Sequence, residues 1–346
     1  MYIKESIAIS PQNTISEEFF TEKAREITGI KYNAIEPNYR ETIPVRVLRR
    51  MGKAIRMATG AGAPLLQKNP NVEAIIIGTA HGGMEDSIKF LNQIITYEEG
   101  TLTPTNFVQS TPNAIAGGLA QMSKCYGYNN THTNDGLSFE GAVLDALLLT
   151  RNKEVNALLL GAIEEISEYN YNLEFLQGRF KENENISSKE LLKTDTKGTV
   201  AGEGATMFYI ENSPENALAK IEDVDTFCFP TDDELQENLE AFLKQNHLSI
   251  NDIDSLISGR SGDNRQNKFY DIIASNFKDS NIYTYKNLVG EYPTSSAFAT
   301  WLACQIIQGK NIPKEAFWKS KNKTSKTVLI YNQHKNKQHS FILMRK

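Results

Sequence analysis

The side chains that could do chemistry are few and scattered along this sequence. His132, Asp135 and Ser138 lie close together and are the residue types of a serine hydrolase triad. The segment GLSFEG around Ser138 lacks the G-x-S-x-G pattern of a nucleophile elbow, and closeness in sequence does not give triad geometry. We therefore interpret Asp135 or Ser138 as the N-cap of a helix, with Glu140 in its first turn.

Other candidate groups also have simpler structural interpretations. Glu291 could act as a general base if it is buried, but a hydrogen-bonded structural carboxylate is the simpler interpretation. His81 precedes two glycines, which favours a turn residue over a ligand. Residues 201–206 (AGEGAT) lack the lysine of a phosphate-binding P-loop, so nucleotide binding is not expected.

Composition indicates a globular protein with a substantial core. The 346 residues are 40% hydrophobic and 23% charged, and the net charge of −5 argues against a broad electrostatic grip on nucleic acid. The three cysteines (Cys125, Cys228, Cys304) lack metal-ligand spacing, and their sparse, odd number argues for a reducing compartment. We see no signal peptide and no apolar window near the ~20 residues of a membrane span. We therefore expect a cytoplasmic protein without metal or cofactor.

Apolar patterning predicts alternating strands and helices. Short apolar runs predict buried strands over 72–78, 157–161, 206–211, 255–258 and 328–331. Helical spacing predicts helices over 85–95, 139–150, 235–245 and 295–308. This alternation indicates an α/β fold with mainly parallel strands. Matching strand–turn–helix and turn–helix patterns in the two halves suggest a duplicated unit.

A lysine-rich segment lies near the end of the chain. Residues 310–326 hold six lysines around Phe317 and Trp318. A solvated surface segment is the simpler interpretation. The alternative is a docking patch for an acidic carrier protein, because clustered lysines raise the local potential.

Several motifs occur in the order found in one enzyme family. Gly202-Glu203-Gly204-Ala205, followed by a predicted strand, resembles the GEGA element of β-ketoacyl synthases, the condensing enzymes of fatty-acid and polyketide assembly. Pro112-Asn113-Ala114, Asp252-Ile253-Asp254 and the spacing from Lys286 to Gly290 are similar to further elements of that family. The resemblance implies an α/β, thiolase-type fold. Its two duplicated halves, 1–211 and 212–346, would form five layers in the order α-β-α-β-α.

The resemblance also locates the residues that the family uses for condensation, a cysteine nucleophile and two histidines. The nucleophile position corresponds to Gly136, and a slip of one or two residues reaches no cysteine. The histidine positions correspond to Gly259 and Glu291, and Lys286 retains the family lysine. The family's glycine-rich loop, which helps form the oxyanion hole, should lie near 332–339, where this sequence has no glycine.

Because every reactive side chain is replaced, we expect no catalytic residue. The resemblance then implies a silent subunit similar to chain-length factors, although those usually carry glutamine at the nucleophile position. Such a subunit pairs with an active ketosynthase in polyketide, aryl-polyene or fatty-acid-type synthesis and meets an acyl carrier protein. The resemblance places 107–116 near the dimer interface and the far end of the acyl tunnel, so Phe107, Asn113 and Ser138 are the candidate substrate-binding residues.

Two other functions stay open. One is an enzyme with altered acyl-transfer or decarboxylase chemistry that uses Glu291 or Ser138. The other is a homodimeric protein that binds acyl chains or acyl carriers.

Overall fold

A single large sheet runs through the protein. The computed structural model describes residues 1–21 and 23–346, and within them eleven strands form one continuous sheet. The strand order is β11 (Phe317–Lys319), β10 (Asn281–Thr284), β9 (Ser255–Ser258), β12 (Thr327–His334), β13 (Gln338–Arg345), β8 (Ala219–Cys228), β1 (Tyr2–Ile9), β7 (Gly204–Glu211), β5 (Ala157–Glu164), β3 (Ala74–Gly78), β4 (Tyr128–His132). Two residue pairs join β1 to β8, so the sheet divides there into two parts. A small second sheet pairs β2 (Lys31–Tyr32) with β6 (Ala201–Gly202).

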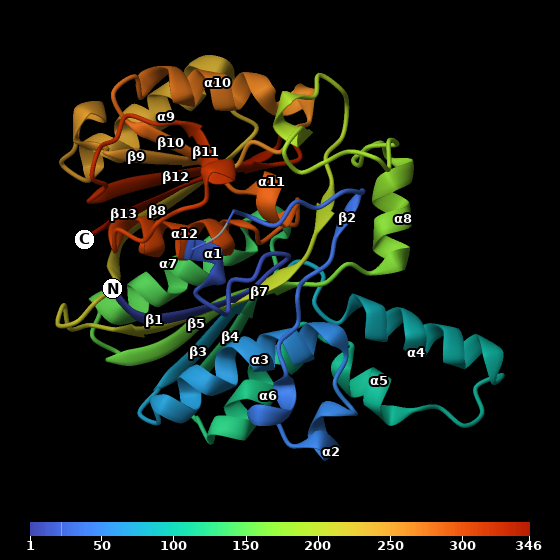
Figure 1. The fold of residues 1–346 in the computed structure, drawn as a ribbon. Helices are drawn as coiled ribbons and strands as arrows, with labels where there is room; N and C mark the ends of the chain where they lie inside the picture. Colours follow the sequence, from blue (N-terminus) through green and yellow to red (C-terminus); the bar gives the residue numbers. More distant parts are fainter. Residues whose placement is uncertain (22) are drawn as a thin grey trace.

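Helices cover both parts of the sheet and fill the space between them (Figure 1). One outer face carries α9 (Asp232–Gln245) and α10 (Asn267–Asn276), and the other carries α3 (Lys53–Lys68) and α6 (Ala114–Ser123). Between the sheet parts lie α7 (Ser138–Arg151) and α12 (Ser296–Ile307), whose apolar residues form the largest core cluster. The layers therefore follow the predicted order α-β-α-β-α.

Smaller helices complete the chain. They are α1 (Glu18–Thr21), α2 (Val45–Leu48), α4 (Met84–Thr96), α5 (Pro104–Gln109), α8 (Glu168–Leu176) and α11 (Lys286–Val289). None of the helices in the described residues combines the length and apolar character needed to span a membrane.

Strand direction differs from the sequence expectation. All five predicted strands and all four predicted helices are present. The expectation of mainly parallel strands is wrong, however, because β3 is parallel to β4 and β5, and β9 to β10 and β12, while the remaining pairs of the large sheet are antiparallel. Strands such as β1 and β8 mix polar and apolar residues, so they lack the continuous apolar run by which buried parallel strands are recognised.

The buried strand β5 shows how the fold positions the site. Every residue of β5 is buried, and Gly161 has no room for a side chain, because a Cβ there would lie 2.0 Å from Met207 Sδ. The strands β3, β4 and β5 run parallel, so their carboxyl ends meet at one edge of the sheet. Glu164, the loop after β3 and the turn that leads into α7 therefore gather at that edge.

Candidate functional site

The turn between β4 and α7 holds the predicted nucleophile position. A short 3₁₀ turn over Asp135–Leu137 leads into α7, and Asp135 adopts a left-handed backbone conformation with φ 47°. The Ser138 hydroxyl donates to the Asp135 carbonyl at 2.8 Å and accepts from the Asn134 amide at 2.8 Å. The prediction that Asp135 or Ser138 is the N-cap is wrong, because Leu137 holds that position and no side chain caps the start of α7. Ser138 instead braces the turn.

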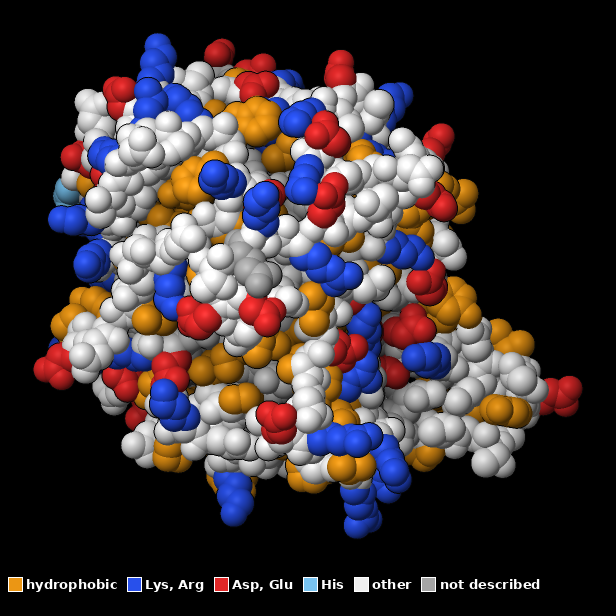
Figure 2. Space-filling view, viewed as in Figure 1, with side chains coloured by type: hydrophobic (Ala, Val, Ile, Leu, Met, Phe, Trp, Pro, Cys, Tyr) orange, Lys and Arg blue, Asp and Glu red, His pale blue; other side chains and the backbone are white. Residues whose placement is uncertain are grey.

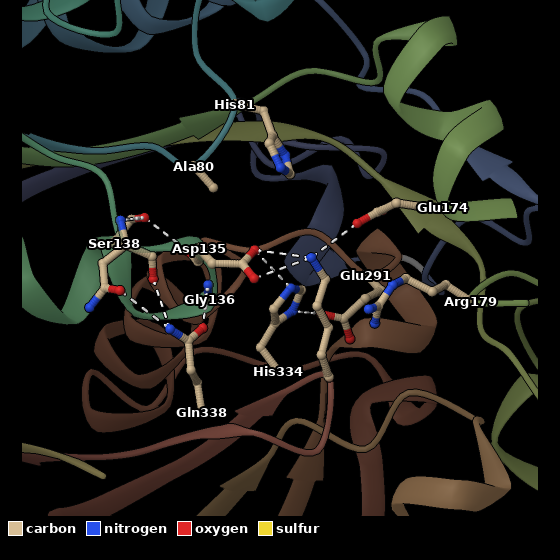
Figure 3. A network of polar contacts seen from close by, with 12 residues as sticks. Ala80, His81, Asp135, Gly136, Ser138, Glu174, Arg179, Glu291, His334 and Gln338 are labelled. Carbon is tan, nitrogen blue, oxygen red and sulfur yellow. Dashed lines mark hydrogen bonds and ion pairs between the residues drawn. The ribbon is translucent and has the colours of Figure 1, made fainter. Parts of the chain in front are cut away.

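A β-hairpin lies over this turn (Figure 3). The Gly136 amide donates to Gln338 Oε1 at 2.9 Å, and Gln338 Nε2 donates to the Asn134 carbonyl at 3.2 Å. A Cβ at Gly136 would lie 2.2 Å from the Cβ of His334, so His334 occupies the space that a nucleophile side chain would need. The loop expected over 332–339 is this hairpin, because β12 continues to His334 and β13 begins at Gln338.

Charged side chains of alternating sign run through the site (Figure 3). In order, they are Lys286, Glu291, His334, Asp135, Lys335 and Glu174. We call this set the charge chain. Its first member is inaccessible to solvent, while Asp135 keeps 40% of its side chain exposed.

Contacts between neighbours in the charge chain are close. Lys286 Nζ lies 2.6 Å from Glu291 Oε2, and Glu291 Oε1 lies 3.3 Å from His334 Nδ1. His334 Nε2 lies 3.2 Å from Asp135 Oδ1, and Lys335 Nζ lies 3.2 Å from the same carboxylate. Lys335 Nζ also lies 3.2 Å from Glu174 Oε1 on α8. The charge chain therefore ties the hairpin to α7, α8 and the residues after α11.

The ion pairs keep these groups charged. Burial alone would raise the pKa of Glu291, but Lys286 and His334 outweigh it and lower that pKa. Burial would likewise raise the pKa of Asp135, which His334 and Lys335 hold well below its ordinary value. Burial opposes the protonated form of His334, yet Asp135 and Glu291 raise its pKa above the ordinary value. The ring of His334 is therefore held as an imidazolium between two carboxylates, and each ring nitrogen lies within ion-pair distance of one of them.

Gly259, the position predicted to correspond to the first family histidine, is also closely surrounded. A Cβ at Gly259 would lie 2.5 Å from Asn332 Oδ1 and 3.1 Å from the Tyr270 hydroxyl. The Tyr285 hydroxyl lies 3.2 Å from the same point and donates to Asn332 Oδ1 at 3.0 Å. Burial raises the pKa of both phenols well above the ordinary value, so they stay neutral. Neither glycine position has room for a reactive side chain while these neighbours stay in place.

The residue types of a hydrolase triad do not assemble. His132 Nε2 lies 2.8 Å from Asp145 on α7, and Asn130 Nδ2 and the Tyr128 hydroxyl donate to the same carboxylate at 3.1 and 3.0 Å. Ser138 is fully buried and bonded to the backbone of its own turn. A serine nucleophile activated by His132 is therefore not formed.

A pocket of about 190 Å³ opens in front of the charge chain. Its lining includes His81, Glu164, Glu174, Arg179, His334 and Lys335, and none of its described lining residues is a cysteine. Burial raises the pKa of Glu164 to about 8, against the hydrogen bonds from the Ala80 and His81 amides. His81 thus binds Glu164 through its backbone, as a turn residue does.

The three predicted substrate-binding residues do not come together. Phe107 lies on α5 with 61% of its surface exposed. Asn113 precedes α6 and accepts a hydrogen bond from Thr131 at 3.0 Å, and Ser138 is buried under the hairpin. None of the three lines the pocket in the described structure.

The other motifs have structural roles. Glu203 of the GEGA element is fully buried, pairs with Lys53 Nζ at 2.5 Å and accepts from the amides of Ala34 and Ile166 at 2.9 Å. In the lysine-rich segment, Lys310 pairs with Glu17 and Lys323 with Asp254, which reduces its free positive charge. No cluster of three His, Cys, Asp or Glu side chains with the geometry of a metal site occurs in the described residues.

The structure brings Gly136, Glu291 and Lys286 to one site, and the residues that fill this site were not predicted from the sequence. His334, Lys335 and Glu174 were not singled out. The available signal was the segment HKNK at 334–337, a basic stretch at the place where the resemblance implies glycines.

Comparisons with known proteins give the same fold. Residues 23–177 match the family model of the β-ketoacyl synthase N-terminal domain. Curated protein sequences give no match. The ishigamide ketosynthase/chain length factor structure is similar at 16% identity with TM-score 0.78, over 100% of this chain and 98% of that one. A Xenorhabdus doucetiae ketosynthase in complex with its chain length factor gives 12% identity and TM-score 0.79, over 99% and 97%.

A type II polyketide synthase acyl-carrier protein in complex with its ketosynthase is similar at 13% identity with TM-score 0.73, over 99% of this chain and 98% of that one. At these identities the structures establish the fold. The predicted thiolase-type α/β fold and the resemblance to β-ketoacyl synthases are therefore confirmed.

Proposed function

We propose that this β-ketoacyl-synthase-like chain is a catalytically silent subunit that pairs with an active ketosynthase in polyketide or aryl-polyene synthesis. One observation carries the proposal: the positions assigned to the nucleophile and the first histidine are glycines whose side-chain space is taken by His334 and by Asn332. Without a nucleophile there is no acyl-enzyme. The assignment of Gly136, Gly259 and Glu291 to family positions, and the division into halves 1–211 and 212–346, belong to this proposal.

The second family histidine position supports the same function. Glu291 cannot donate a hydrogen bond to a developing oxyanion while it is ionised, and Lys286 and His334 hold it ionised. A cation lies near each oxygen of its carboxylate, which disfavours proton uptake by Glu291 as a general base. No observation favours altered chemistry at Glu291 or Ser138.

An exposed apolar face supports pairing with another subunit. β4 is an edge strand of the large sheet, and an edge strand offers backbone groups to a second chain. Beside it, α7 exposes Leu144 (45%) and Leu148 (50%), although the rest of this helix packs between the sheet parts. Tyr126 (90%) extends the same face. Clustered exposed apolar residues mark interaction surfaces.

Similar solved structures motivate the choice of partner. They include ketosynthases described together with a chain length factor and one described with an acyl-carrier protein. In this proposal the partner supplies the cysteine and histidines, and the carrier brings the acyl units. A second copy of the chain is the competing occupant of the same face.

The test is purification of this chain alone and together with a cysteine-bearing condensing enzyme. We expect a heterodimer by native mass spectrometry, and condensation of malonyl-loaded carrier protein only when both subunits are present. Condensation by this chain alone would refute the silent assignment. A stable homodimer that excludes the condensing enzyme would favour the homodimeric binding protein. A Glu291→Gln, Ser138→Ala variant controls for residual chemistry; because it removes the partner of Lys286 and the brace of the turn, its folding is checked by circular dichroism before the activity of the pair is compared.

A further inference from the structure

A second pocket, of about 210 Å³, lies where the helices α3, α4 and α8 begin. We call it the acidic pocket, because its lining includes four carboxylates and two lysines: Glu85, Asp86, Glu165, Glu168, Lys53 and Lys89. Figure 2 shows acidic and basic side chains gathered between the positions of α8 and α4. The acidic pocket is separate from the charge chain, which contributes none of its described lining residues.

Both lysines of the acidic pocket already pair with a carboxylate. Lys53 Nζ lies 2.5 Å from Glu203 Oε1, and Lys89 Nζ lies 3.6 Å from Glu85 Oε1. Glu168 lies at the rim, with 68% of its side chain exposed to water. The remaining carboxylates, those of Asp86 and Glu165, therefore have no cation of their own within the described lining.

Asp86 is buried without a partner. Only 7% of its surface is exposed, and its carboxylate makes no hydrogen bond or ion pair with any other described residue. Its Oδ2 lies 2.3 Å from the point where a Cβ at Gly52 would be, but the Gly52 amide donates to Gln109 Oε1 at 2.8 Å instead. A buried carboxylate without a donor or a cation costs free energy, and burial accordingly raises the pKa of Asp86.

Glu165 adds a second carboxylate to the acidic pocket. Its Oε2 accepts from the Ala54 amide in the first turn of α3 at 3.1 Å, while its Oε1 has no hydrogen bond within the described structure. Burial and the charge of Asp86 raise the pKa of Glu165 to about 7. Stabilisation of the α3 N-terminus accounts for one oxygen of Glu165. It accounts neither for the other oxygen nor for Asp86.

The group that fits these free acceptors is an ammonium ion. It carries one positive charge and three N–H donors, which matches the two oxygens of Asp86 and the free oxygen of Glu165. Ca²⁺ would need about six to eight oxygen ligands, and no cluster of three His, Cys, Asp or Glu side chains with metal-site geometry occurs in the described chain. Ile166 also lines the acidic pocket and gives an apolar wall for an alkyl chain.

We propose that the acidic pocket binds a small aliphatic amine, whose ammonium group pairs with the carboxylates of Asp86 and Glu165. The inference concerns a ligand of this chain alone. It does not depend on the pairing with a condensing enzyme proposed above.

The test uses 1,4-diaminobutane as the probe and the full chain as the protein. The diamine should bind saturably by isothermal titration calorimetry and should raise the thermal midpoint. Two controls separate charge from hydrogen bonding: 1,4-butanediol has a similar shape without charge, and tetramethylammonium has charge without an N–H donor. Neither should bind.

Asp86→Asn is the informative variant. It should weaken diamine binding at least about tenfold, because a hydrogen bond to a charged group is lost. It also removes an unpaired buried charge, so the free energy of unfolding of the unliganded variant should be unchanged or higher, whereas loss of a structural carboxylate would lower it. Glu237→Gln, at an exposed position on α9, makes the same change of charge and should alter neither quantity. Circular dichroism confirms that both variants fold.

Several results would overturn the inference. They are the absence of saturable diamine binding, equal binding by Asp86→Asn and the unsubstituted chain, and equal binding of the diol or of tetramethylammonium. Displacement of the diamine by an equal concentration of MgCl₂, but not of NaCl, would assign the acidic pocket to a metal ion and would also overturn it. All of these measurements leave the proposed pairing untouched, because they use no partner subunit.

Discussion

The replacement Gly136→Ala tests directly whether the nucleophile position is filled. An added Cβ would lie 2.2, 2.5 and 2.9 Å from the Cβ, Cγ and Cδ2 of His334, all closer than carbon atoms approach in folded proteins. His334 cannot turn aside easily because Asp135 and Glu291 hold its ring. The backbone cannot retreat easily because Gln338 binds the Gly136 amide. Overpacking of this kind lowers the free energy of unfolding by about 1–3 kcal/mol.

Gly117→Ala is the matched control. Gly117 lies in α6, and no heavy atom falls within 4 Å of its added Cβ, so alanine there should raise the free energy of unfolding by about 0.5–1 kcal/mol. Chemical denaturation followed by circular dichroism measures both. In a double-mutant cycle, His334→Gly, which removes the Cβ, Cγ and Cδ2 that the added methyl would meet, should absorb most of the penalty of Gly136→Ala. Equal stability of Gly136→Ala and the unsubstituted protein would show that the position is open, and the silent assignment would lose its main support.

The remaining predictions concern buried charges. Lys286→Met removes the nearer of the two cations beside Glu291 and should lower the free energy of unfolding by about 3–5 kcal/mol, most of which Lys286→Met with Glu291→Leu should recover. The pKa of Asp135 is lowered in the folded protein. The ionised carboxylate therefore contributes fully to the free energy of unfolding above its ordinary pKa of 3.8, and this contribution is lost as pH falls through the folded pKa. Asp135→Asn should lower the free energy of unfolding less in acid than near neutral pH. The pKa of His334 is raised in the folded protein. The protonated ring therefore contributes fully to the free energy of unfolding below pH 6.5, and this contribution is lost as pH rises through the folded pKa. The loss of stability caused by His334→Gln should become smaller in denaturation series at alkaline pH. Glu203→Gln weakens the pair with Lys53 and should lower the thermal midpoint without changing partner association by native mass spectrometry.

Local patterns were enough to predict the buried elements. β5 and β9 are short apolar runs in the sequence and lie fully buried in the sheet, and α12 carries apolar residues around its whole circumference. Strand direction depends on connections between distant segments, which a run of isoleucines or leucines does not record. The antiparallel pairing of β7 with β1 and β5 was therefore not predicted.

The site shows a similar division. The lysine-to-glycine spacing located Lys286 and Glu291, because both belong to one short segment. The contents of the space around Gly136 could not be predicted, since His334 reaches it from a hairpin in the other half of the chain. The absence of glycine at 332–339 indicated that the family's glycine-rich loop had changed. It could not show which side chain points toward Gly136, because side-chain direction in a strand depends on register.

The way the site is filled bears on its role. Apolar side chains could occupy this space, and a buried ion pair often gives no more stability than well-packed apolar residues. The charge chain instead selects one position of the hairpin. His334 and Lys335 each lie beside an opposite charge only if the hairpin sits in one register over the turn. A slip of one residue would turn these side chains to the other face and leave the carboxylate of Asp135 without its partners. The charges around the predicted nucleophile position therefore also fix the geometry of the surface next to which a partner subunit would bind.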